Sequence, residues 1–166
     1  MKNIDYEYKR LLSRVLDSGV RKKSRTKTRT LSHFGATIEH DMRNGFPLIT
    51  TKHVSFKCAK TELLWILNGR TDLKYLKENG VHYWDNDYKR SGRTDNTLGK
   101  IYGAQWRNFN GVDQIYNLLK EIEREPSSRR LMVSAWNPAD ADDMALPPCH
   151  DSFQVYIYGN EMDLLW

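Results

Sequence analysis

Hydrophobic residues recur at intervals of three and four positions in several segments, which is the spacing of one face of an α-helix. This pattern predicts amphipathic helices over residues 4–18, 56–67, 72–78 and 112–123. Gly19 and Pro126 follow the first and the last of them, as expected of residues that end helices. Thr71 is the expected N-cap of the third helix.

Other segments have the β-branched and aromatic residues that favour strands. They predict strands over residues 31–42, 131–136, 152–158 and 161–166. Gly159-Asn160 is expected to join the last two strands in a hairpin, and residues 46–52 form a short extended piece. The polar segment 86–99 has the composition of a surface loop.

The bulk composition fits one globular domain, residues 1–166, that is large enough to have a core. No apolar run approaches the ~20 residues of a membrane span, and the N-terminus has no secretory signal. The two cysteines suggest reduced thiols in a cytoplasmic setting, and their spacing predicts no metal site. The net charge of +5 favours an anionic partner, either a polynucleotide or a small phosphate ester.

The most basic segment is residues 21–30, in which six of ten residues are Lys or Arg. Such a run is consistent with a solvated loop or with a patch that binds polyanions nonspecifically. A sharper interpretation is a phosphate clamp, in which an arginine and threonines donate hydrogen bonds to a dianion. A nuclear-localisation signal is a weaker alternative, and the composition alone leaves all of these open.

Cys149 follows Pro147-Pro148 and precedes His150 and a predicted strand. The two prolines fix φ and supply no N–H, so they exclude a helix and predict a stiff turn that presents a thiol. Such a turn suits a nucleophile, because it limits how far the sulfur can move. A small buried hydrophobic residue is an equally good interpretation of a free cysteine.

Glu62 lies within a mostly apolar helix, where a carboxylate is expected to be paired, solvated or functional. A salt bridge and a proton-handling acid both satisfy this requirement. The aromatic residues Trp84, Tyr102 and Trp106 are typical of a core, but they could also form a stacking wall for a flat heterocycle. The adjacent arginines at 129 and 130 are either solvated or a fork for a phosphate.

Eight blocks, in order along nearly the whole chain, resemble the thymidylate synthase family. They are Ser24-Arg-Thr-Lys-Thr-Arg-Thr-Leu-Ser-His-Phe-Gly35, Gly45-Phe-Pro-Leu-Ile-Thr-Thr-Lys52, Glu62-Leu-Leu-Trp65, Trp84-Asp85, Tyr102-Gly-Ala-Gln-Trp-Arg107, Ser128-Arg-Arg130, Ser134-Ala-Trp-Asn137 and Met144-Ala-Leu-Pro-Pro-Cys-His150. Any one block is a weak signal, whereas the ordered set is specific.

This resemblance implies an α/β (α+β) fold in which a bent, mixed sheet is flanked by helices, working as a homodimer. It implies a cytoplasmic methyltransferase that makes dTMP from dUMP. The co-substrate 5,10-methylenetetrahydrofolate would be both the one-carbon donor and the reductant. No metal, membrane or nucleic acid is expected as a partner.

The catalytic roles that the resemblance implies fall on four residues. Cys149 would attack C6 of the uracil ring, and Glu62 would organise water and proton transfer around the pyrimidine carbonyl. Tyr102 would help to remove the C5 proton, and His150 would support the surroundings of the cysteine.

The implied binding roles fall on both halves of the sequence. Arg25 would bind the nucleotide phosphate, while Arg129 and Arg130 would reach the phosphate in the site of the other subunit. The implied folate contacts are Trp84, Lys52 and Ser55. The serine stands where a histidine is common in the family, which puts that contact in doubt.

The resemblance covers about the N-terminal 60% of a family member, judged from usual domain size. We therefore expect this chain to need the C-terminal part for activity. Lys27 and Arg29 stand where the family usually has glycines in the phosphate loop. Three alternatives remain: a deoxypyrimidine nucleotide hydroxymethylase, an inactive fragment, and a basic nucleic-acid-binding protein.

Overall fold

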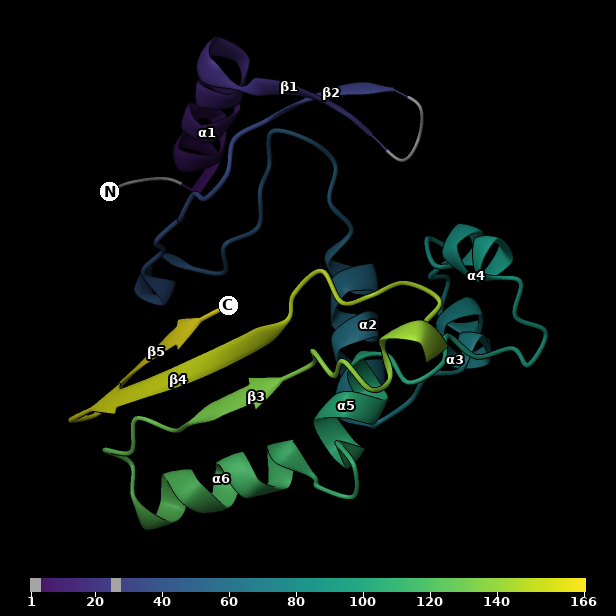
Figure 1. The fold of residues 1–166 in the computed structure, drawn as a ribbon. Helices are drawn as coiled ribbons and strands as arrows, with labels where there is room; N and C mark the ends of the chain where they lie inside the picture. The colour runs from purple at the N-terminus through teal and green to yellow at the C-terminus, as the bar shows by residue number, and fades with distance from the viewer. Residues whose placement is uncertain (1–3, 25–27) are drawn as a thin grey trace. The chain divides into compact units, whose positions relative to one another are not determined.

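The structure, a computed structural model, describes residues 4–24 and 28–166 of the chain. It divides into two compact units, Met1–Phe56 and Lys57–Trp166, which are taken here one at a time (Figure 1). The expectation of a single domain over residues 1–166 stays a prediction.

The first unit begins with helix α1 (Ile4–Ser18), which ends where the sequence predicted. Strands β1 (Val20–Lys23) and β2 (Arg29–Ser32) then pair antiparallel, with Val20 opposite Ser32. The strand predicted over residues 31–42 is wrong beyond Ser32, because the chain leaves the ladder there and forms only the 3-10 helix η1 (Met42–Asn44).

Asp5 fastens the end of this unit to α1. Its buried carboxylate accepts hydrogen bonds from the Thr50 N–H at 2.8 Å, from the Thr50 hydroxyl and from the Thr51 N–H at 3.4 Å. The hydrogen bonds from Thr50 lower the pKa of the Asp5 carboxyl. The residues just before Lys52 are thereby held against the first turn of the helix.

The second unit contains five α-helices among the described residues. They are α2 (Phe56–Leu67), α3 (Leu73–Glu78), α4 (Asp85–Ser91), α5 (Tyr102–Asn108) and α6 (Gln114–Arg124). The first residue of α2, Phe56, is the last residue of the first unit. Helices α2, α3 and α6 confirm the predicted periodicity. The predicted cap of α3 is wrong by one position, since the Asp72 carboxylate accepts from the Tyr75 N–H at 3.1 Å in the place expected of Thr71.

Helix α4 overturns the loop predicted from residue 86 onward. Its sequence is polar throughout, so it has no hydrophobic period. Acidic residues occupy its first turn and basic residues its last, which suits the helix dipole. Gly92 ends it in the left-handed conformation, at a φ of 71°.

The strands of the second unit form one antiparallel sheet in the order β3-β4-β5. They are β3 (Met132–Ser134), β4 (Ser152–Tyr158) and β5 (Glu161–Leu165), which confirm the three predicted C-terminal strands; the 3-10 helix η2 (Ala141–Asp143) lies between β3 and β4. Helix α6 packs against β3 (Figure 1). The class is therefore mixed α and β, while every strand pair in the described ranges is antiparallel.

A hydrophobic core fills the second unit beneath these elements. Its completely buried members come from helices, loops and a strand: Trp65, Leu76, Leu98, Ile101 and Val133. Burying each of these side chains contributes roughly 1.5–3 kcal/mol before entropy is counted. None of the helices in residues 4–24 and 28–166 combines the length and apolar character that crossing a bilayer requires.

Candidate active site

Cys149 is exposed on the turn that leads into β4. Its backbone N–H donates a hydrogen bond to the Tyr102 hydroxyl oxygen at 2.7 Å, across 47 positions of sequence. Pro148, immediately before it, is buried, which fixes the approach of the turn. Cys149 is therefore not the buried hydrophobic residue of the alternative interpretation, while its role as a nucleophile stays a prediction.

Tyr102 opens helix α5 and is 3% exposed. Burial raises the pKa of its phenol, and the backbone N–H groups of Cys149 and His150 oppose that shift. The phenol is therefore neutral near pH 7. It accepts a hydrogen bond from the cysteine turn and keeps its own proton available as a donor.

His150 is enclosed by aromatic rings. It stacks on Tyr102 with ring centroids 4.0 Å apart and planes at 15°, and Trp166 lies on it at 5.0 Å. Burial lowers the pKa of the imidazole, against the opposing charge of Asp151. The ring is therefore neutral at physiological pH, with one nitrogen as donor and the other as acceptor.

Glu62 is half-buried on α2 and is paired with Trp84, whose indole N–H donates to its Oε1 at 2.6 Å. The Trp84 ring in turn meets Tyr102 edge to face, with centroids 6.3 Å apart. A continuous series of contacts therefore joins Glu62, Trp84, Tyr102 and the Cys149 backbone. These residues come from four separate parts of the chain and are brought together within the second unit.

Tyr83 also lies at this carboxylate, although the sequence did not single it out. Burial raises the pKa of its phenol, and the charge and hydrogen bonding of Glu62 raise it further. The Tyr83 phenol therefore lies close enough to Glu62 to feel its charge, as the indole of Trp84 does on its own side. The only sequence signal for it is its place in the aromatic run before Asp85.

A buried amide network supports the segment before the cysteine turn, and the sequence had not indicated it. Asn137 donates to Asp140 at 2.9 Å and to Gln105 at 3.2 Å, and Gln105 donates to Asp140 at 3.0 Å. The hydrogen bond from Lys100 and then that from Gln105 lower the pKa of the Asp140 carboxyl. They fasten the start of the connection to Cys149 onto helix α5.

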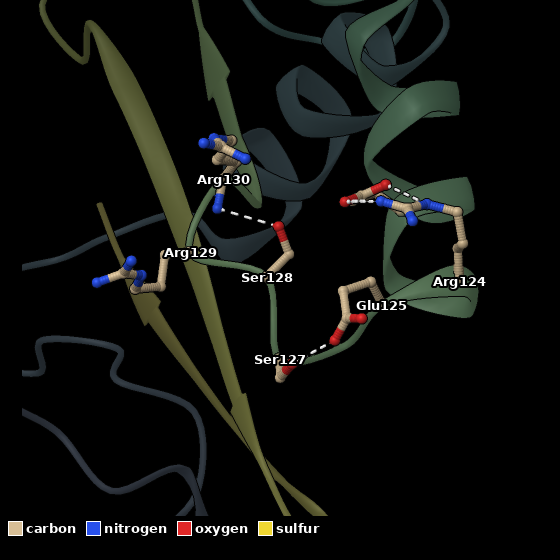
Figure 2. A pocket seen from close by; sticks show the side chains of 7 residues that line it. Arg124, Glu125, Ser127, Ser128, Arg129 and Arg130 are labelled. Carbon is tan, nitrogen blue, oxygen red and sulfur yellow. Dashed lines mark hydrogen bonds and ion pairs between the residues drawn. The ribbon is translucent and has the colours of Figure 1, made fainter.

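Arg129 and Arg130 lie on the exposed turn between α6 and β3 (Figure 2). They line a hollow of about 650 Å³ with Arg124, Ser127 and Ser128. Arg124 is paired with Glu121, whereas neither of the other two arginines forms an ion pair with a described residue (Figure 2). Glu121 and Glu125 also line the hollow, and the charge of Glu125 offsets part of the charge of the two arginines that form no ion pair there.

The sheet register separates these arginines from the thiol of the same chain. Ser134 lies opposite Ser152, near the cysteine, and Met132 lies opposite Gln154. The side chain of Gln154 donates to the Arg129 carbonyl at 3.0 Å, at the far end of the strand pair. Arg129 and Cys149 thus lie beyond opposite ends of the paired part of β3 and β4.

The remaining predicted binding residues belong to the first unit. Arg25 and Lys27 lie outside the described residues. The Lys52 ammonium lies 5.7 Å from the centroid of the Tyr8 ring, and Ser55 is half-buried. Their proposed folate and phosphate contacts stay predictions.

The exposure of the Trp84 ring bears on whether the second unit could contact a folate. The residue is 8% exposed and its N–H is already engaged, so only a small part of the ring is free for stacking. Trp84 therefore offers a ligand a ring edge rather than a ring face, and its folate contact stays a prediction. In the ranges that the structure describes, no cluster of three His, Cys, Asp or Glu side chains could hold a metal ion.

Comparison with known proteins shows the family to which the chain belongs. The family model for thymidylate synthase matches residues 6–166. The chain is 43% identical to a thymidylate synthase of Mycoplasma genitalium over 183 aligned positions, covering 95% of this chain and 64% of that protein. It is also 43% identical to a thymidylate synthase of Malacoplasma penetrans, covering 91% of this chain and 61% of that protein. It thus spans less than two thirds of the length of either relative, and it belongs to the thymidylate synthase family.

Proposed function

We propose that this chain supplies the nucleophile and the proton-handling groups of an enzyme that converts dUMP to dTMP, with 5,10-methylenetetrahydrofolate as co-substrate. The observation that carries the proposal is the series of contacts from Glu62 through Trp84 and Tyr102 to Cys149. An exposed thiol lies at one end of it and a carboxylate at the other. This combination suits addition to, and proton transfer around, a flat electron-poor ring.

In this mechanism the Cys149 thiolate adds to C6 of the uracil ring, and the displaced π-electron pair moves toward C5 and the O4 carbonyl. Glu62, oriented by Trp84, handles protons at that carbonyl through water. C5 then bonds to the one-carbon unit of the co-substrate and loses its proton to water; the neutral Tyr102 phenol, which lies beside the cysteine turn, assists this step by orienting that water. Elimination of the Cys149 sulfur then releases the product.

The folate supplies the one-carbon unit and the hydride that reduces it. Trp84 contributes a ring edge to its site, and Lys52 contributes a positive charge that suits its carboxylates. Ser55 is a small polar residue in the same predicted contact set.

The proposed enzyme is a cytoplasmic homodimer. Arg129 and Arg130 lie at the other end of the β3–β4 ladder from Cys149. A two-fold dimer would allow them to reach the phosphate held in the partner's site. The bent, mixed sheet of the resemblance is proposed for the complete protein.

The direct test is covalent capture of 5-fluorodeoxyuridylate. The protein is purified at the length of its relatives, which includes the C-terminal part expected to be needed for activity, and is incubated with this nucleotide and methylenetetrahydrofolate; the adduct is located by mass spectrometry of peptides. We expect the adduct on Cys149, its loss in Cys149→Ser, and its retention in the control Cys58→Ser. An adduct that persists in Cys149→Ser would contradict the proposal.

A further inference from the structure

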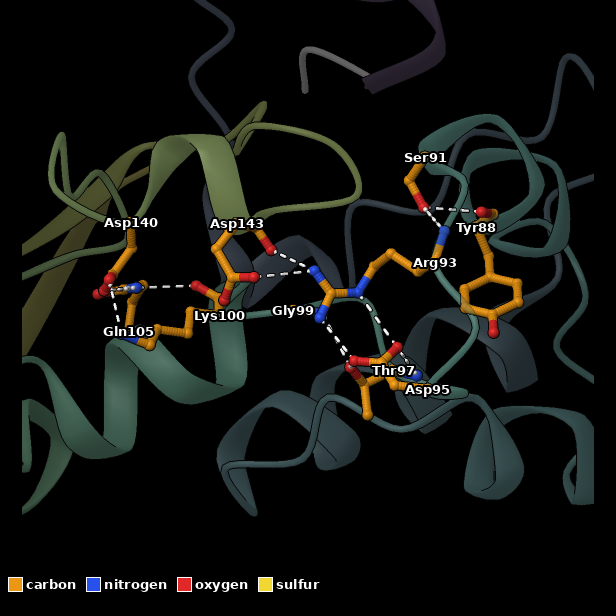
Figure 3. A network of polar contacts seen from close by, with 10 residues as sticks. All are labelled: Tyr88, Ser91, Arg93, Asp95, Thr97, Gly99, Lys100, Gln105, Asp140 and Asp143. Carbon is orange, nitrogen blue, oxygen red and sulfur yellow. Dashed lines mark hydrogen bonds and ion pairs between the residues drawn. The ribbon is translucent and has the colours of Figure 1, made fainter.

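Arg93 makes an ion-pair network in the loop between α4 and α5 (Figure 3). Its guanidinium donates to Asp95 at 3.2 and 2.6 Å, and to the Asp143 carboxylate at 3.0 Å and carbonyl at 2.7 Å. The side chain is only 21% exposed, which reduces screening by water. Arg93 therefore joins its own loop to Asp143, which lies 50 positions later in the sequence, at the start of the segment that leads to Cys149.

The two segments also touch through their backbones. The Ala145 N–H donates to the Leu98 carbonyl at 2.9 Å. Gly99 has a φ of +76°, and a Cβ placed on it would lie 1.8 Å from the Asp143 carbonyl oxygen. Such a close approach is possible only for glycine, so the contact at Asp143 is tight and fixed in register.

The loop that bears Arg93 is itself firmly held. The Leu73 N–H donates to the Asn96 carbonyl at 3.0 Å, and the Leu98 N–H donates to the Thr71 carbonyl at 2.9 Å. Arg93 and its neighbours are thus attached to the start of α3. A contact that they make is a contact with the body of the second unit.

The stretch Asp143–Cys149 is consequently held at both ends by residues 93–102. One end is held by Arg93 and Leu98, and the other by the hydrogen bond from the Cys149 N–H to Tyr102. Pro147 and Pro148 stiffen the part between them. Loss of the contacts at the Asp143 end is therefore expected to shift the Cys149 sulfur at the other end.

We infer that Arg93 is a positioning residue for the nucleophilic thiol, which it holds in place through Asp143 and the double-proline turn. Arg93, Asp95 and Asp143 all lie outside the eight sequence blocks that resemble the family. The inference rests on the proposed function only for the identity of the ring that the thiol attacks.

Hydrogen exchange of the peptide that covers residues 144–152 tests the inference. In Arg93→Ala we expect exchange of this peptide to be about tenfold faster, because the two hydrogen bonds that the charged guanidinium donates to Asp143 are lost. Peptides from α2 and α6 should exchange as in the parent. Arg90→Ala is the matched control, since that arginine pairs with Asp87 within α4 itself.

Two further variants separate positioning from general folding. Arg93→Lys should restore part of the protection, because one ammonium can still reach an acceptor. Asp143→Ala keeps the backbone acceptor and should accelerate exchange by about threefold, as fewer charge-assisted bonds are lost. Exchange in 144–152 that is unchanged in both Arg93→Ala and Asp143→Ala overturns the inference, as does equal acceleration in α2 and α6.

Adduct formation on the same samples links the inference to the chemistry. We expect Arg93→Ala to slow adduct formation about tenfold at saturating 5-fluorodeoxyuridylate, with less than about a twofold change in the half-saturating concentration. If the parent forms no adduct but Arg93→Ala still releases residues 144–152, the proposed function fails and the positioning role stands. If the parent forms the adduct and Arg93→Ala matches it in rate and exchange, the positioning role fails alone.

Discussion

The turn that carries Cys149 is held at both ends by hydrogen bonds to residues 93–102, whereas the basic ribbon of β1 and β2 is exposed along both strands. In the ribbon, Lys23 lies directly opposite Arg29, a like-charge pair that destabilises a strand ladder. A reacting atom must be placed to within a fraction of an ångström, which requires a rigid support. By contrast, basic side chains attract a phosphate over roughly 10 Å, so a site that acts by this attraction does not need a rigid support.

The largest expected effect of a single change on stability is at Gly99. Gly99→Ala places a Cβ against the Asp143 carbonyl and strains a φ of +76°. We expect the free energy of unfolding in urea to fall by about 2–4 kcal/mol. The matched control is Gly35→Ala, whose φ is +79° with nothing near its Cβ; strain alone should cost about 1 kcal/mol there. Equal losses would contradict the tight contact at Asp143.

Tyr102→Phe is expected to have the next largest effect. It removes the acceptor of the Cys149 N–H while keeping the ring against His150. Leaving that N–H without its partner should cost about 1–2 kcal/mol of unfolding free energy and speed exchange of the Cys149 amide. Tyr116→Phe, at an exposed position of α6, serves as the control and should change neither quantity. An unchanged Cys149 amide in Tyr102→Phe would show that the turn is held by other contacts.

Acidification should weaken the same region through His150. Burial holds the folded-state pKa of His150 below its usual 6.5, so the unfolded chain binds this proton first as the pH falls. The free energy of unfolding should therefore decline below about pH 7 and level off below the folded-state pKa, by up to roughly 1.4 kcal/mol per pH unit. The measurement is urea unfolding at several pH values, compared with His150→Phe. A slope that is identical in the variant would exclude His150 as its source.

The smallest effect is expected in the basic ribbon. Arg29→Thr removes the like charge opposite Lys23, so stability at low salt should rise by up to about 0.5 kcal/mol and the gain should vanish at high salt. Arg21→Thr is the matched control, because Arg21 lies opposite Leu31 and its loss relieves no direct pair. Equal gains in both variants would indicate a general charge effect rather than the cross-strand pair.

Periodicity predicted α1, α2 and α6 because each has a long apolar face. Helix α4 was missed because its residues are polar on all sides, and α5 because it is short and contains Gly103. That glycine is a packing requirement: a Cβ there would lie 2.2 Å from the Arg70 carbonyl oxygen. No pattern in residues 33–42 predicted that the chain would leave the β1–β2 ladder after Ser32.

The candidate site could be predicted in its residue types but not in its connections. The double proline before Cys149 and a carboxylate in an apolar helix are local signals. The hydrogen bond from Trp84 to Glu62 spans 22 positions, and that from Arg93 to Asp143 spans 50. Such pairs depend on how the elements pack, so the sequence offered no rule that would join them.

The most direct test of the account is whether dUMP shields the thiol. Alkylation of Cys149 by iodoacetamide is followed by peptide mass spectrometry, with Cys58 as the internal reference. If the contacts from Glu62 to Cys149 form a pyrimidine nucleotide site, dUMP at ten times its dissociation constant should slow alkylation of Cys149 by about tenfold and leave Cys58 unchanged. Alkylation of Cys149 at the same rate with and without millimolar dUMP would contradict the account.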